Sequence, residues 1–183
     1  MALRFAASIL LAYVAPCFAS DIPNLLIDYK TFQTNVREVG EIRGSRRVTE
    51  SEFMRMSGDP STVILDARSA EKFALLHIRG STNLSLPDMT EDELARVIPS
   101  KTTRVLIYCN NNFLNEPKAF PSKVLTASLN VYTYNVLYSY GYTNIYELGP
   151  LLDIRDTKLA FEGTRNTAAL QAFTLQDATN LTD

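Results

Sequence analysis

Cysteine is the residue of this chain best suited to nucleophilic chemistry, and only one of its two cysteines is expected in the mature protein. Cys17 lies in a segment that has the features of a secretory signal, with Arg4 before an apolar core and a small-residue cleavage region ending at Ala19. Cleavage there leaves Cys109 without an intrachain partner. A lone thiol in an oxidising compartment is prone to oxidation, so we expect it to be deeply buried or to be used. The sequence therefore predicts a signal peptide over residues 1–19 and a periplasmic or secreted protein.

The remaining composition argues against several other kinds of chemistry. His77 is the only histidine, and with one mature cysteine it cannot supply the three or four such ligands of a zinc site, so we predict no metal. No glycine-rich phosphate loop is present, and we predict no cofactor. A net charge of -2 gives no general attraction to nucleic acid. The uncharged N-terminal stretch is shorter than the roughly 20 apolar residues of a membrane span, so no membrane association is predicted after signal cleavage.

The elements around Cys109 predict an α/β domain. Residues 63–66 and 104–108 are short apolar runs of the kind that form buried parallel strands, and Cys109 directly follows the second run. A tyrosine-rich helix is predicted over 124–140 and a further strand over 144–148. Alternating strands and helices indicate a three-layer fold with a central parallel sheet flanked by helices. In such sheets functional residues gather beyond the carboxyl ends of the strands, where Cys109 is predicted to lie.

Helix-start signals and composition suggest the limits of this domain. Capping boxes at 49–52 and 90–93 each begin a helix, and Ser69 begins another in which Phe73, Leu76 and His77 share one side. We predict one globular domain over residues 48–152. Residues 20–47 are predicted to be an N-terminal extension that wraps the domain, and residues 153–183 a C-terminal tail.

Two segments of the chain resemble conserved parts of one known family, the rhodanese domains. The first is similar to the motif near the front of those domains and consists of Asp66-Ala67-Arg68, Glu71, Phe73, His77-Ile78-Arg79-Gly80-Ser81 and Asn83-Leu84. The second is similar to the family's active-site strand, the following helix and the last core strand, and consists of the apolar strand ending in Tyr108-Cys109, Gly141-Tyr142 and Asn144-Ile145-Tyr146-Glu147-Leu148.

This resemblance implies a rhodanese-like fold and a role for the thiol. In active members the corresponding cysteine takes a sulfane sulfur from a donor such as thiosulfate and becomes a persulfide, which then passes the sulfur to a nucleophile. The resemblance therefore implies Cys109 as the catalytic residue. It implies structural roles for the front motif, with His77 packed and hydrogen bonded and with Asp66, Arg68 and Glu71 forming an ion-pair and capping network.

The loop after Cys109 departs from the family pattern. Residues 109–123 form a longer run than the usual loop of about six residues around the thiol, and the run contains neither glycine nor arginine. Asparagine tolerates the left-handed conformations that glycine would supply, so an anion-binding loop remains possible. With Asn115 where a C-x5-R loop would place its arginine, phosphatase chemistry is disfavoured. We predict that substrate is bound by Asn110, Asn111, Asn112, Phe113, Leu114 and Lys118.

Three functional hypotheses remain open at this point. The first is an exported sulfurtransferase or sulfur carrier that forms a persulfide on Cys109 and takes a small sulfur-containing anion or a thiol acceptor as partner. The second is a catalytically silent domain that binds a protein or small ligand through loop 110–123. The third is a redox sensor that forms mixed disulfides. Backbone amides converging on the Cys109 sulfur would favour the first, and a cap of Phe113, Leu114 and Phe120 over that sulfur would favour the second.

Overall fold

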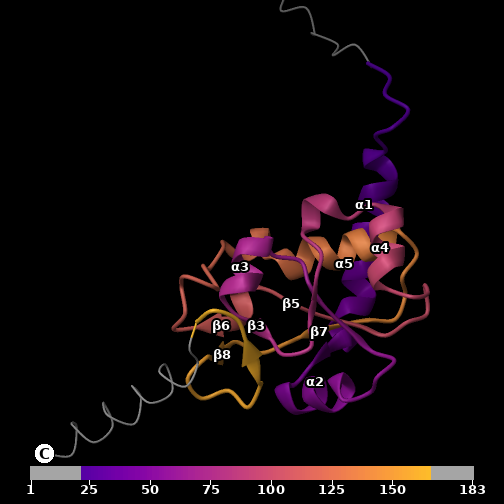
Figure 1. The fold of residues 1–183 in the computed structure, drawn as a ribbon. Helices are drawn as coiled ribbons and strands as arrows, with labels where there is room; N and C mark the ends of the chain where they lie inside the picture. Colours follow the sequence, from indigo (N-terminus) through magenta and orange to yellow (C-terminus); the bar gives the residue numbers. More distant parts are fainter. Residues whose placement is uncertain (1–21, 166–183) are drawn as a thin grey trace, which may run out of the picture.

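The computed structural model describes residues 22–165 and shows a sheet between layers of helices (Figure 1). The predicted signal peptide and residues 166–183 of the predicted tail lie outside the described residues. The strands of the central sheet run in the order β1-β7-β5-β2-β4, and all pair in parallel. Their bounds are β1 Arg47–Val48, β2 Val63–Asp66, β4 Thr82–Asn83, β5 Val105–Tyr108 and β7 Ile145–Leu148. This arrangement confirms the predicted α/β fold with a central parallel sheet.

Alternating side chains of the buried strands fill two separate cores, one on each face of the sheet. Leu65 and Ile107 point into the core beneath α1 (Tyr29–Arg43), α4 (Glu91–Val97) and α5 (Leu129–Ser139). Ile64 and Leu106 point to the opposite face, where α2 (Glu50–Ser57) and a group of phenylalanines pack. The helices α1, α4 and α5 lie together on one side of the sheet in Figure 1, with α2 on the other. Burial on both faces explains why the strands are continuously apolar in sequence.

Three helices begin at the predicted capping residues, but the helix before His77 ends earlier than predicted. The side chains of Thr49, Ser69 and Thr90 each accept a hydrogen bond from the backbone N–H three residues on. Helix α3 (Ala70–Leu75) stops before Leu76, whose extended backbone buries its side chain completely. His77 therefore lies in the short strand β3 (His77–Ile78), and its placement in the helix was wrong.

The predicted helix over 124–140 is divided at Ser128. A 3-10 turn over Leu125–Ala127 comes first, Ser128 has the non-helical backbone angles φ -58° and ψ 129°, and α5 starts at Leu129. The break matters for the site because it turns the amino end of α5 toward the end of β5. Two further 3-10 turns, Gly44–Arg46 and Leu86–Asp88, connect other elements.

The chain beyond residue 152, predicted as a tail, packs on the domain as far as residue 165. Strand β8 (Leu152–Asp153) pairs in parallel with β6 (Phe113–Leu114), and β9 (Phe161–Glu162) pairs antiparallel with β3. Ile154, Leu159 and Phe161 are buried in the phenylalanine-rich core. These residues cover apolar side chains that the domain would otherwise expose to water, which is the driving force for their attachment.

The N-terminal extension is anchored by one helix. Helix α1 packs along α5 and buries Val39, while the segment before α1 projects from the domain and leaves Leu25 and Leu26 exposed (Figure 1).

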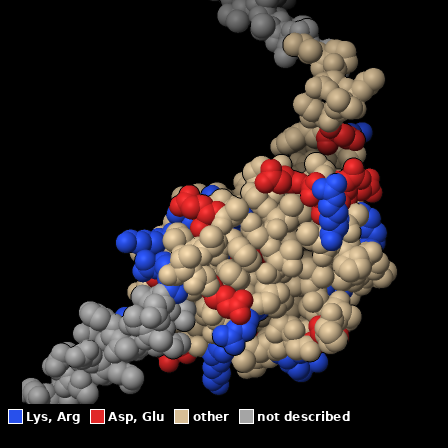
Figure 2. Space-filling view, in the orientation of Figure 1, with Lys and Arg blue, Asp and Glu red and all other residues tan. Residues whose placement is uncertain are grey.

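On the face shown in Figure 2, acidic and basic side chains form small groups around a broad uncharged area. None of the described helices is both long and apolar enough to span a membrane.

Candidate functional site

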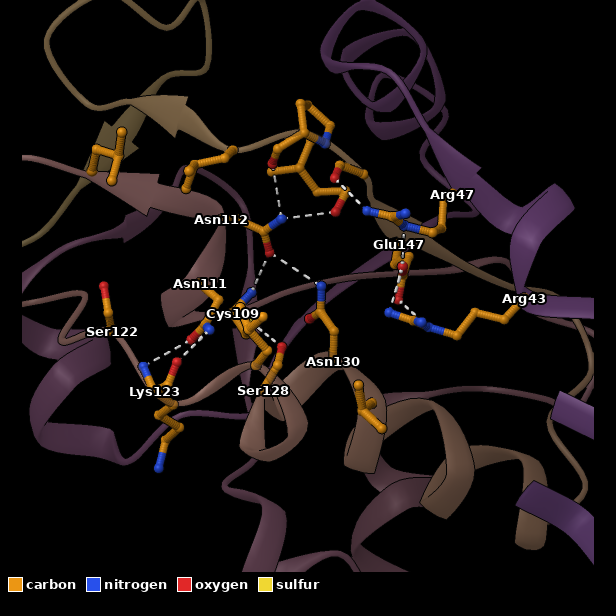
Figure 3. A pocket seen from close by; sticks show the side chains of 17 residues that line it. Arg43, Arg47, Cys109, Asn111, Asn112, Ser122, Lys123, Ser128, Asn130 and Glu147 are labelled. Atoms are coloured by element: carbon orange, nitrogen blue, oxygen red, sulfur yellow. Dashed lines mark hydrogen bonds and ion pairs between the residues drawn. The ribbon is translucent and has the colours of Figure 1, made fainter. Parts of the chain in front are cut away.

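Cys109 borders a pocket at the carboxyl end of the sheet. It directly follows β5 and is 1% exposed, and the pocket beside it has a volume of about 520 Å³ (Figure 3). The pocket lining comes from three parts of the chain: the loop after Cys109, the start of α5, and the segment where α1, β1 and the end of β7 meet. The sheet therefore places the thiol at the edge where parallel α/β folds bind their ligands.

The sulfur of Cys109 lies beside polar groups at the amino end of α5. Its Sγ is 3.4 Å from Oγ of Ser128, which immediately precedes α5 and whose side chain makes no capping hydrogen bond. Cys109 also precedes the 3-10 turn Asn110–Asn112. The amino end of a helix carries partial positive charge and unpaired N–H groups, so α5 stabilises an anion at this position.

Asn112 fixes the backbone that carries the thiol. Its Oδ1 accepts the Cys109 N–H at 2.9 Å and the Nδ2–H of Asn130 at 3.1 Å. Its own Nδ2 donates to the carbonyl oxygens of Leu148 at 2.8 Å and Pro150 at 3.1 Å. One buried carboxamide thus connects the thiol loop with α5 and with the residues after β7.

The other two asparagines of the run hold the long loop together. Asn110 donates from Nδ2 to the carbonyl of Pro121 at 2.8 Å. Asn111 donates to the carbonyl of Lys123 at 2.8 Å and accepts the Lys123 N–H at 3.0 Å. The Asn111 carboxamide is thus used at both ends within the protein, whereas Asn110 uses its Nδ2 and its Oδ1 makes no hydrogen bond to the described residues.

The predicted substrate-binding residues do not all lie at the pocket. Asn111, Asn112 and Leu114 line it, whereas Asn110, Phe113 and Lys118 do not. Phe113 packs in the core beneath the sheet, with its ring centroid 4.5 Å from that of Phe120. Neither phenylalanine therefore caps the Cys109 sulfur. Strand pairing with β8 explains why the two neighbours differ. Successive side chains of a strand point to opposite sides, so Phe113 points inward and Leu114 points toward the pocket.

Several pocket residues were not among those predicted. Ser128 and Asn130 come from the start of α5, and Arg43 and Arg47 come from the N-terminal extension and β1. The clustering of arginines at 43, 46 and 47 was the only signal in the sequence, and nothing in it indicated that this segment lies beside Cys109.

Glu147 holds the two arginines at one side of the pocket. It is 1% exposed, and its carboxylate contacts Arg43 through Nε at 2.9 Å and Nη2 at 2.8 Å and Arg47 through Nε at 2.8 Å. Burial raises the pKa of Glu147 above its ordinary value, and the two guanidinium groups oppose that effect.

The front motif is remote from the pocket and forms a buried network. Arg68 contacts Asp66 at 2.6 Å and donates to the carbonyls of Leu76 and Ala119, and His77 stacks on Phe73 with 3.7 Å between ring centroids. None of these residues lines the Cys109 pocket. The placement of Glu71 in this network was wrong, because its carboxylate contacts Lys72 on the surface instead.

Within residues 22–165 no group of three or more histidine, cysteine, aspartate or glutamate side chains is placed to hold a metal ion.

The domain is a parallel α/β fold with a single thiol at the end of its central strand, beside a pocket that carries basic side chains. The model of the rhodanese-like domain family matches residues 49–149. The chain therefore belongs to the rhodanese-like family.

Similar solved structures were found at low sequence identity. A rhodanese with anions from E. coli is 20% identical, with a TM-score of 0.38, 56% of this chain and 98% of that chain covered. The BH2092 protein from Bacillus halodurans is 15% identical, with a TM-score of 0.48 and coverage of 72% and 85%. A thiosulfate sulfurtransferase from Pseudomonas aeruginosa is 20% identical, with a TM-score of 0.44 and coverage of 63% and only 19%. A comparison with curated proteins gives no match.

Proposed function

We propose that this protein is an exported sulfurtransferase or sulfur carrier that forms a persulfide on Cys109. The observation that carries the proposal is the position of Cys109, which borders an open pocket with both polar and apolar walls, and whose sulfur lies 3.4 Å from the Ser128 hydroxyl beside the amino end of α5. A persulfide is an anion at neutral pH, and this is the charge that a helix amino end stabilises.

The chemistry needs one cysteine only. The Cys109 thiolate attacks the outer sulfur of thiosulfate, the sulfur–sulfur bond of thiosulfate breaks, and sulfite leaves with the bonding electron pair. A second nucleophile then attacks the outer sulfur of the persulfide and regenerates the Cys109 thiolate. No oxidant is consumed, and no resolving cysteine is required.

The experiment is intact mass spectrometry of the mature protein before and after treatment with thiosulfate, followed by a cyanide chase. We expect a gain of one sulfur atom that cyanide removes and that a Cys109→Ser variant lacks. An unmodified Cys109 after treatment with thiosulfate and with a small-molecule persulfide donor would overturn the proposal.

A binding function is the second candidate, and one surface feature favours it. Apolar side chains line or flank the mouth of the pocket, with Leu114 45%, Val124 73%, Leu125 86% and Leu151 58% exposed. Exposed apolar groups in one area are typical of surfaces that bind proteins. On this hypothesis loop 110–123 and its neighbours dock a protein partner, and replacing Val124, which does not line the pocket, by Asp abolishes that interaction while leaving persulfide formation intact.

Export is a separate part of the proposal. It rests on the sequence of residues 1–19 and on the prediction of cleavage after Ala19. Expression of the complete chain in a bacterial host, with fractionation and N-terminal sequencing, tests it. We expect a mature chain that begins at Ser20 in the periplasmic fraction, and an uncleaved cytoplasmic chain would contradict export.

A further inference from the structure

Two arginines that line the pocket come from outside the matched family segment. Arg43 is the last residue of α1 and Arg47 the first of β1, whereas the family match begins at residue 49. In Figure 3 both side chains extend to the Glu147 side of the pocket, and Asn130 lies between them and Cys109. The N-terminal extension therefore contributes part of the wall that faces the thiol.

These arginines retain hydrogen-bonding capacity and positive charge. Arg43 uses Nε and Nη2 on Glu147, and Arg47 uses Nε on Glu147 and Nη2 on the carbonyl of Gly149 at 2.8 Å. The Nη1 group of each makes no hydrogen bond to the described residues. Two guanidinium groups against one carboxylate leave one net positive charge, and guanidinium groups bind carboxylates with directed paired hydrogen bonds.

Asn130 supplies an unsatisfied acceptor between the arginines and the thiol. The residue is 5% exposed, and its Nδ2 donates to Oδ1 of Asn112. The Asn130 carboxamide cannot be turned around. Asn112 must face it with Oδ1, because this Oδ1 accepts the Cys109 N–H and the Asn112 Nδ2 donates to two carbonyls. The Asn130 oxygen in that position would meet another acceptor. The Oδ1 of Asn130 is left without a donor. A buried acceptor in this state is destabilising, and an N–H group of a ligand would satisfy it.

We propose that the pocket takes an amino-acid-type thiol, a short molecule that carries a carboxylate and an N–H donor near its sulfur. The carboxylate binds Arg43 and Arg47, the N–H group donates to Oδ1 of Asn130, and the sulfur faces Cys109. This inference rests on the proposed sulfur transfer and specifies its acceptor. The acceptor thiolate attacks the outer sulfur of the Cys109 persulfide, the bond between the two persulfide sulfurs breaks, and its electron pair returns to Cys109 as thiolate. The sulfur leaves as the persulfide of the acceptor.

The test compares four thiols as acceptors for the persulfidated protein. Cysteine carries both groups, 3-mercaptopropionate lacks the amine, cysteamine lacks the carboxylate, and 2-mercaptoethanol lacks both. Loss of the persulfide is followed by intact mass, with rates expressed per thiolate. We expect cysteine to react about tenfold faster than cysteamine, the size of effect that one charge-assisted contact gives. Equal rates for all four thiols would overturn the inference.

Variants assign the effect to the arginines. Arg47→Gln is expected to lower the rates of cysteine and 3-mercaptopropionate about tenfold and to leave cysteamine unchanged, with partial rescue by Arg47→Lys. Arg79→Gln is the matched control, because Arg79 contacts Glu162 on the surface and does not line the pocket. An equal decrease for cysteamine in Arg47→Gln would show a structural role only and overturn the assignment.

A binding measurement separates failure of this inference from failure of sulfur transfer. Calorimetry with S-methylcysteine, which cannot accept sulfur, measures occupation of the pocket by the unmodified protein. Binding that Arg47→Gln weakens supports the carboxylate subsite even when thiosulfate gives no persulfide. A persulfide that forms normally while S-methylcysteine does not bind overturns the subsite and leaves the transfer chemistry standing.

Discussion

At the scale of single residues, Asn112 explains how a loop without glycine or arginine can still hold the thiol in place. Asn112 is 5% exposed, and its carboxamide joins Cys109 to Asn130, Leu148 and Pro150. Asparagine can do this because it offers an acceptor and two donor hydrogens on a short, planar group. Its role is to position the thiol, while the pocket side chains beyond it are left to contact ligand.

Replacing Asn112 by Ala tests that role. The change leaves a buried N–H group and two carbonyls without their partner, and we expect a loss of about 2–4 kcal/mol in the free energy of unfolding, measured by urea denaturation. Asn144→Ala is the matched control, because Asn144 makes one exposed hydrogen bond to the carbonyl of Thr102. Equal losses in the two variants would contradict a special role for Asn112.

At the scale of elements, the short strand β9 and the residues after it attach the C-terminal part of the described chain to the domain. They hydrogen bond to β3 and to the end of α3. The N–H groups of Thr164 and Arg165 donate to the carbonyls of Ala74 and Leu75, each at 3.0 Å. Gly163 permits this close approach, since it has φ of 139° and a Cβ at this position would lie 2.4 Å from the carbonyl oxygen of Leu75. Arg165 also contacts Glu116 of the thiol loop at 2.8 Å, so the attachment extends to the loop that follows the thiol.

Gly163→Ala should release this attachment. The added methyl group cannot fit against backbone atoms, and strain of about 1–3 kcal/mol is expected. Hydrogen exchange should show faster exchange at Thr164 and Arg165 with the sheet still protected. Gly40→Ala is the control, because Gly40 lies in α1 with open space around it and the change should stabilise the helix by about 0.5–1 kcal/mol. Unchanged exchange in Gly163→Ala would refute the argument.

At the scale of the whole molecule, a buried arginine joins parts of the fold that are distant in sequence. Arg68 is 2% exposed, contacts Asp66 at the end of β2, and donates to the carbonyl of Leu76 before β3 and to that of Ala119 in the thiol loop. The Tyr108 hydroxyl donates to the same Asp66 carboxylate at 2.5 Å. Burial and that carboxylate raise the pKa of Tyr108 well above its ordinary value, so the hydroxyl remains a donor.

Arg68→Met should destabilise the whole domain. It leaves the Asp66 carboxylate buried without its cation, for which we expect a loss of about 3–5 kcal/mol in the free energy of unfolding. Arg55→Gln removes a surface ion pair with Glu52 and should leave the free energy of unfolding nearly unchanged, because water screens the exposed pair. Thermal and urea denaturation of both variants give the comparison, and similar values for the two would mean that the Arg68 network contributes little.

The sequence by itself determined strands β2, β5 and β7 of the parallel sheet, the capped starts of α2, α3 and α4, and the position of Cys109 after β5. These features depend on local patterns, since apolar runs, capping residues and spacing act over a few neighbouring residues. The family resemblance extended this to the structural role of the Asp66–Arg68 pair.

Only the tertiary structure decided what surrounds the thiol. It placed Arg43 and Arg47 beside the pocket, although both lie far from Cys109 in the sequence, and it turned Phe113 into the core. It also showed that residues 153–165 complete the apolar core on the α2 side of the sheet. Such contacts depend on packing between segments far apart in the chain, which no local pattern records. The pocket chemistry therefore follows from how α1, β7 and α5 meet at one edge of the sheet.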